Sequence, residues 1–210
     1  MVLSPFEVNA DLDTGYLATT AQSGTRLRTE LKDIASSISV VTKDFMNDIG
    51  ATDLGGLLVY TLGTEVNGVG GNFSDAGTVA NPSGNETDYD GAFASAGPST
   101  RVRGLTSADL SRDFFITSIP LDGYNTDRVE ISRGPNAILF GLGSPAGIIN
   151  NSLITANLRN RRTTVELHTD QYRSFRSTLD HNQVLLRDKL ALRVAAVYGD
   201  NSYKVEEAWR

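Results

Sequence analysis

The 210-residue chain has no cysteine and only two histidines. Without cysteine there is no disulfide framework, no thiolate zinc site and no cysteine nucleophile. His168 and His181 each lie in a segment that alternates apolar and polar residues, so we interpret both as strand side chains rather than metal ligands. No Ser/His/Asp arrangement has a supporting motif either. We therefore expect no metal, no cofactor and no enzymatic activity.

Positive charge and long apolar runs are also scarce. The chain has 19 Lys and Arg against 25 Asp and Glu, a formal net charge of −6. A nucleic-acid surface needs a basic face, so this class of partner is excluded. No apolar run reaches the ~18 residues of a membrane-spanning helix. Residues 1–5 lack the basic and apolar regions of a signal peptide, and both ends are abrupt, so we expect a fragment of a longer protein.

The first half of the chain mixes strand and helix patterns. Residues 38–42 form a β-branched run that predicts a strand. Thr42 offers an N-cap oxygen for a following helix, and Gly50 offers a left-handed stop. Thr52 and Asp53 can start a second helix with Leu54, Leu57, Leu58 and Leu62 at helical spacing.

The segment from residue 63 to residue 98 differs from its surroundings. It is rich in Gly, Asn, Ser and Ala, and it contains acidic residues but no Lys or Arg. This composition predicts a long loop. Residues 100–104 and 114–119 then predict two further strands, the second followed by a turn at residues 120–123.

Residues 163–199 alternate strictly between apolar and polar side chains in three runs of about ten residues. Polar turns near residues 172–174 and 187–189 separate the runs. Such alternation is typical of outer-membrane barrel strands, and equally of an ordinary antiparallel sheet with one wet face. Both interpretations predict antiparallel strands for this segment.

Residues 128–151 contain the most informative motif of the chain. A strand that carries Glu130 and Arg133 leads into Gly134-Pro135, an aromatic-Gly pair ending at Gly141, an Ala-Gly pair ending at Gly147 and an Ile-Ile-Asn strand. This order and spacing resemble the C-terminal signature of the plug domain of TonB-dependent outer-membrane receptors.

Three earlier segments resemble the same plug pattern in the same order. They are residues 24–42, residues 45–58 and the Arg-Gly strand Arg101–Leu105, which contains Gly104. The resemblance implies an α+β plug-type domain with a small mixed sheet and short helices, followed by antiparallel strands from the start of a transmembrane β-barrel. It divides the chain into a flexible N-terminal segment (1–23), a plug domain (24–156) and truncated first barrel strands (157–210).

The resemblance also implies a function and partners. The chain would be the plug of a receptor that gates energy-coupled uptake of an iron chelate, cobalamin or an oligosaccharide across the bacterial outer membrane. A TonB-type energy transducer in the periplasm would bind an extended segment by strand addition, for which sequence demands are loose. The TonB-box candidate is Leu3, Ser4, Pro5, Phe6, Glu7 and Val8.

Two arginines stand at matching strand ends, in Arg103-Gly104 and Arg133-Gly134. The resemblance implies that they lock the plug to carboxylates of the barrel wall, a role that suits the planar fork of arginine. Glu130 is the nearest carboxylate in sequence and is included in this plug–barrel lock. Within this chain we expect both arginines to be exposed or only locally paired.

Two other functions remain open from the residues. The first is a secreted or cell-surface β-rich binding module, which the alternating strands would also fit. The second is a cytoplasmic α/β enzyme, which rests on the missing signal peptide and on the glycines at 141, 143 and 147. Those glycines miss the dinucleotide-binding spacing, and a strand rather than a long helix follows them.

Overall fold

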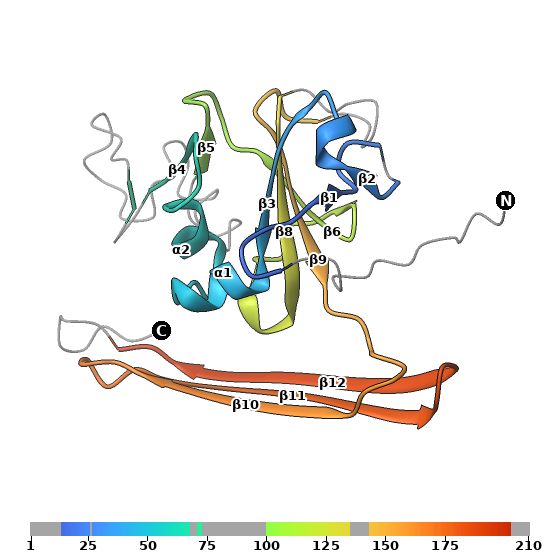
Figure 1. Ribbon diagram of the computed structural model, residues 1–210. Helices are drawn as coiled ribbons and strands as arrows, with labels where there is room; N and C mark the ends of the chain where they lie inside the picture. The colour runs from blue at the N-terminus through green and yellow to red at the C-terminus, as the bar shows by residue number, and fades with distance from the viewer. Residues whose placement is uncertain (1–13, 26, 68–70, 73–99, 135–142, 203–210) are drawn as a thin grey trace, which may run out of the picture. The chain divides into compact units, whose positions relative to one another are not determined.

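The computed structural model describes residues 14–25, 27–67, 71–72, 100–134 and 143–202 (Figure 1). It divides into two compact units, residues 1–153 and 154–210. The first unit thus ends at Leu153, slightly before the boundary at Ala156 that the sequence suggested. Within the described ranges, no helix is both long and apolar enough to cross a membrane.

A five-stranded sheet forms the centre of the first unit (Figure 1). Its order is β3 (Ser37–Thr42), β8 (Thr126–Arg133), β9 (Gly147–Leu153), β6 (Asp109–Arg112) and β7 (Phe115–Ile116). Neighbouring strands are antiparallel except β6 and β9, which run parallel. The sheet is therefore mixed, as predicted.

Two short strand pairs and two 3-10 turns complete the β structure of this unit. β1 (Thr20–Ala21) pairs with β2 (Thr29–Glu30), and β4 (Thr64–Val66) pairs with β5 (Thr100–Val102). The 3-10 turns are η2 (Leu31–Asp33) and η3 (Gly123–Asn125). The strand β4 lies inside the segment that was expected to be a loop, whereas residues 73–98 of that segment lie outside the described ranges.

The two predicted helices begin at the predicted caps. In α1 (Lys43–Asp48), the hydroxyl of Thr42 accepts a hydrogen bond from the Phe45 amide at 3.3 Å. In α2 (Leu54–Leu58), a carboxylate oxygen of Asp53 accepts from the Gly56 amide at 2.8 Å. Such caps satisfy amide groups that have no partner inside a helix.

The prediction that Leu62 continues the apolar face of α2 is wrong. The hydroxyls of Thr61 and Thr64 donate to the Leu58 carbonyl, at 3.1 and 2.8 Å, and end the helix there. Leu62 is consequently 88% exposed. The strand predicted for residues 114–119 is also shorter than expected, because Phe114 adopts a left-handed φ of 69° in the turn between β6 and β7.

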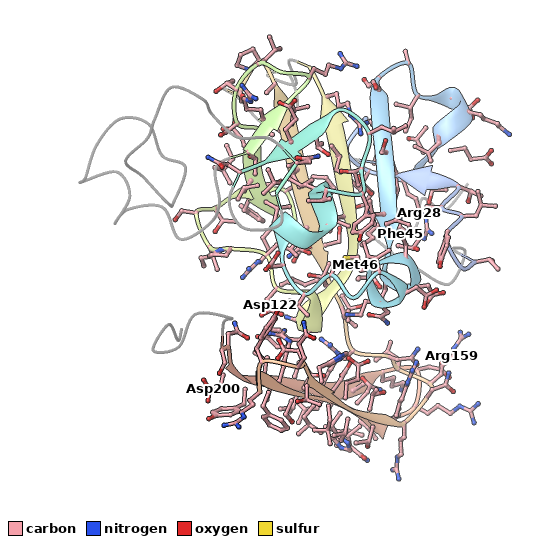
Figure 2. All side chains as sticks on the ribbon, turned by 90° about the vertical axis from the view of Figure 1, so that its left-hand side faces the viewer. Arg28, Phe45, Met46, Asp122, Arg159 and Asp200 are labelled. Carbon is pink, nitrogen blue, oxygen red and sulfur yellow. The ribbon has the colours of Figure 1, made fainter. Side chains whose placement is uncertain are left out.

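The hydrophobic core lies between the helices and one face of the sheet, and Met46 of α1 packs into it (Figure 2). Successive side chains of a strand point to opposite faces, so Val129 and Ile131 of β8 enter this core while Arg128, Glu130 and Ser132 face the other side. The buried core residues are Val41, Met46, Leu54, Leu57, Leu58, Val66, Val102, Ala108, Leu121, Val129, Ile131, Ala146 and Ile149.

The second unit is an antiparallel sheet of β10 (Arg162–Thr169), β11 (Phe175–Leu186) and β12 (Leu190–Asp200). The register aligns Val165 with Leu179 and Leu179 with Ala196, so one face is apolar. The other face carries polar residues of β10 and β11. The predicted antiparallel strands are confirmed, including the polar turns between them.

Candidate functional site

The plug-like signature forms the junction of β8 and β9. Gly147 begins β9 with a left-handed φ of 122°, and a Cβ atom there would lie 2.0 Å from the carbonyl oxygen of Ser132. No side chain fits such an approach, so a glycine is required where the two strands meet. Gly134, with φ of 97°, donates its amide to the Ala146 carbonyl at 3.1 Å. Pro135 and Gly141 lie outside the described residues.

A carboxylate that the sequence reasoning missed fixes the end of this signature. Asp109 of β6 accepts a hydrogen bond from the Ser144 amide at 2.6 Å, and the Ser144 hydroxyl donates to the Ser107 carbonyl at 2.6 Å. These bonds attach the start of β9 to its parallel neighbour β6. Only the three-dimensional pairing of β6 with β9 reveals this role, since Asp109 and Ser144 are far apart in sequence.

The two candidate locking arginines both lie close to Gly63. A Cβ atom at Gly63 would be 3.8 Å from Nε of Arg133 and 3.9 Å from Cγ of Arg103. Arg103 is exposed and has a left-handed φ of 54°, followed by Gly104 with φ of 67°. Its amide donates to the Gly63 carbonyl at 2.8 Å, which fixes the turn.

Arg133 is partly buried beside Arg103. It donates to the hydroxyl of Ser39 at 2.7 Å and to the carbonyl of Leu62 at 2.6 Å. Burial, and then the positive charge of Arg103, lower the pKa of the Arg133 guanidinium from its usual range. In the part of the chain that the structure describes, no carboxylate forms an ion pair with either arginine. The Arg133 guanidinium therefore relies on neutral acceptors, with a second cation beside it.

Glu130 does not join these arginines. It is 1% exposed on the opposite face of β8 from Arg133, where its carboxylate accepts the Ser23 amide at 2.7 Å and the Gln22 amide at 3.1 and 3.2 Å. Within this chain Glu130 therefore binds the backbone before β2, and its assigned part in the plug–barrel lock stays a prediction. Glu130 and Arg133 are three residues apart on β8, so their side chains point to opposite faces of the sheet. The period of two along a strand could have indicated this from the sequence alone.

Arg128 completes the contacts that hold the segment before β2. It is 3% exposed, lies 3.8 Å from the Glu130 carboxylate and donates to the Thr20 carbonyl at 3.0 Å. Residues 20–23, which the sequence placed in a flexible segment, are thus fastened to the sheet by a buried charged pair. We call residues 14–23 the N-terminal strap.

The earlier part of the strap packs on α1. Tyr16 meets Phe45 edge to face, with ring centroids 5.2 Å apart, and its hydroxyl donates to Asp48 at 2.7 Å. The Thr42 hydroxyl donates to the Gly15 carbonyl at 2.8 Å. The TonB-box candidate, residues 3–8, precedes the strap and lies outside the described residues.

The two units together define a class of protein. The described residues form a small mixed sheet with an N-terminal strap, an arginine pair without an ion-pair partner among them, and a separate antiparallel sheet with one apolar face. These are the parts of a plug followed by barrel-type strands. Among the described residues, no group of three or more His, Asp or Glu could hold a metal ion.

Comparisons with known proteins agree with this class. The model of the TonB-dependent Receptor Plug Domain matches residues 30–148, so the chain belongs to the TonB-dependent receptor family. It is 30% identical over 152 residues to the ferrioxamine receptor of Yersinia enterocolitica, covering 67% of this chain and 18% of that protein. It is 30% identical over 171 residues to the catecholate siderophore receptor Fiu of Escherichia coli K12, covering 77% and 19%.

A solved structure shows the same fold. The ferripyoverdine receptor of the Pseudomonas aeruginosa outer membrane, bound to ferripyoverdine, superposes with a TM-score of 0.71 at 23% identity and covers 90% of this chain and 23% of that one. The chain therefore spans about a fifth of the length of these relatives. The family match favours a receptor over the two alternatives, a binding module and a cytoplasmic enzyme.

Proposed function

We propose that the chain is the plug and first barrel strands of an outer-membrane receptor that imports a ferric siderophore. The family match over residues 30–148 carries this proposal. Among the substrates that the sequence left open, an iron chelate is favoured over cobalamin and oligosaccharide. The support is that the similar curated proteins are named as ferrioxamine and catecholate siderophore receptors.

The substrate is tested by growth under iron limitation. A host that lacks its own siderophore receptors, supplied with the complete gene, is given ferric hydroxamates, ferric catecholates or no chelate. Growth with one iron chelate, and loss of that growth when the transducer gene is deleted, is the expected result. Rescue of a cobalamin-dependent or oligosaccharide-dependent strain, with no response to any iron chelate, would contradict the assignment.

The arginine pair supports a lock between plug and barrel. Arg103 and Arg133 lie together near Gly63 and have no ion-pair partner among the described residues, while Arg133 is partly desolvated. Two neighbouring guanidinium groups repel each other, so an anionic partner beside them lowers the energy of both. We propose that carboxylates of the barrel wall, which the remaining strands of the receptor would supply, fill this role.

The lock is tested with matched arginine variants of the complete receptor. Arg133→Ala leaves its barrel carboxylate buried and unpaired, which costs about 3–5 kcal/mol if burial is complete. Arg101→Ala is the control, because Arg101 lies two residues before Arg103 and pairs locally with Glu65 at 3.1 Å. Plug release, measured as antibiotic entry through the receptor, should rise for Arg103→Ala and Arg133→Ala only. Equal antibiotic entry for all three variants would refute the proposed lock.

The N-terminal partner is the last part of the proposal. A TonB-type transducer would bind residues 3–8 in extended form and pull on the strap that follows. Strand addition relies on backbone hydrogen bonds, so proline substitutions test it better than side-chain changes. Replacing Phe6 and Val8 by proline should abolish uptake but keep siderophore binding. Uptake that survives both prolines places the transducer site elsewhere.

A further inference from the structure

One end of the β10–β12 sheet is strongly cationic. The loop 157–161 with the first residue of β10, and the turn between β11 and β12, carry five cations and one acid. All five cations are exposed. They are Arg159, Arg161, Arg162, Arg187 and Lys189, and the acid is Asp188. We call this group the cationic rim.

Hydrogen bonds hold the two parts of the cationic rim together. The Asp188 amide donates to the Leu158 carbonyl at 3.2 Å, and Nε of Arg159 lies 2.9 Å from the Asp188 carboxylate. Arg161 reaches the Val184 carbonyl with Nη2 at 3.5 Å. The single acid is thus engaged by one arginine, and the rim keeps an excess of positive charge.

The opposite end of the same sheet has a different charge. Its turn 170–174 and the end of β12 carry Asp170, Arg173 and Asp200. Figure 2 labels Arg159 and Asp200 at the two opposite ends of this sheet. The excess of positive charge therefore lies at the end that carries the cationic rim, whereas the strands carry both signs, as in the pair of Arg193 with Asp180.

Apolar side chains adjoin the cationic rim. Leu158, Leu185, Leu186 and Leu190 are 40%, 54%, 58% and 49% exposed. The apolar face of the sheet continues from them through Leu192, Val194 and Val165, which are also exposed. Exposed leucines next to exposed arginines and lysine match the boundary of a bilayer, where acyl chains give way to phosphate headgroups.

We propose that the cationic rim binds the headgroups of anionic phospholipids and so selects them around this part of the receptor. Basic residues near an anionic membrane surface contribute about 1 kcal/mol each. The three-residue turn Arg187–Lys189 resembles the short turns on the periplasmic side of outer-membrane barrels, which adjoins the phospholipid leaflet. This inference rests on the proposed membrane receptor, because an isolated sheet would meet no bilayer.

Lipid selectivity of the complete receptor tests the proposal. The receptor is reconstituted into phosphatidylethanolamine vesicles with trace spin-labelled phosphatidylglycerol or spin-labelled phosphatidylcholine. The ratio of their association constants for the protein gives the preference for the anionic headgroup. Lys189→Gln should lower this ratio about fivefold, and the triple variant Arg161→Gln/Arg187→Gln/Lys189→Gln about a hundredfold, at ~1 kcal/mol per charge.

Arg173→Gln is the matched control, since it removes one exposed turn cation at the other end of the sheet. It should change the ratio less than twofold. If the wild-type receptor inserts and imports its substrate, yet shows the same ratio as the triple variant, headgroup binding by the cationic rim would be refuted. The proposed receptor function would still stand. A preference for lipopolysaccharide over phosphatidylglycerol would overturn it as well. A receptor that inserts into no vesicle would instead refute the proposed function.

Discussion

Replacement of Glu130 should release the N-terminal strap from the sheet. The carboxylate is almost fully buried, accepts the amides of Gln22 and Ser23, and faces Arg128 at 3.8 Å. In Glu130→Ala, both amides lose their acceptor and a buried arginine loses its carboxylate, a change that costs about 3–5 kcal/mol. Glu130→Gln keeps a neutral acceptor and should cost about 1–3 kcal/mol.

Thiol labelling measures this release directly. The chain has no cysteine, so Ser23→Cys introduces its only thiol at a side chain that is 1% exposed. When opening is fast and reversible, the labelling rate is proportional to the population of the open state, so each ~1.4 kcal/mol raises it about tenfold. Glu130→Ala should therefore accelerate labelling by more than about a hundredfold, and Glu130→Gln by about tenfold.

The control removes a carboxylate that does not touch the strap. Glu65→Gln disrupts the half-exposed pair with Arg101 and should leave labelling at Ser23→Cys unchanged. If Glu130→Ala is labelled at the rate of the unaltered background, the strap is held by other contacts. The reasoning about the buried pair would then be refuted.

Three further changes have definite expectations. Gly147→Ala should prevent stable folding, because its Cβ would lie 2.0 Å from a facing carbonyl, whereas Gly50→Ala, with open space and φ of 67°, should cost only about 1–2 kcal/mol by thermal unfolding. Asp53→Ala should destabilise α2 by ~1 kcal/mol, and Asp53→Asn should restore most of this. The Tyr16 hydroxyl donates to Asp48, which raises the pKa of the phenol, so this bond persists at neutral pH and is lost only as pH rises through the raised value. NMR titration should show that Asp48→Asn returns it toward the ordinary value of about 10.

Local chemistry explains which parts of the fold the sequence predicted. The caps at Thr42 and Asp53 act within a few residues of themselves, so the sequence was sufficient to place both helices. The period of two in residues 163–199 likewise predicted their antiparallel strands. Leu62 was misplaced because hydroxyl groups, rather than a glycine or proline, end α2.

The candidate site depended more on contacts distant in sequence. Glu130 meets backbone amides that precede it by more than a hundred residues, and no side-chain pattern records such partners. The neighbourhood of Arg103 and Arg133 was expected only from the family resemblance. Only the folded chain shows that both side chains lie close to Gly63.

The strand β8 connects two of these features, since Glu130 binds the strap on one face and Arg133 joins the arginine pair on the other. β8 lies between β3 and β9, and its register with both fixes the position of each side chain. A slip of one residue would turn Glu130 into the apolar core, and a slip of two would carry Arg133 about 7 Å from its acceptors. The strand β8 therefore cannot shift its register by one or two residues without losing these contacts. A pulling force on the strap is therefore either resisted by these contacts or detaches the strap. A stepwise shift of β8 cannot relieve the force.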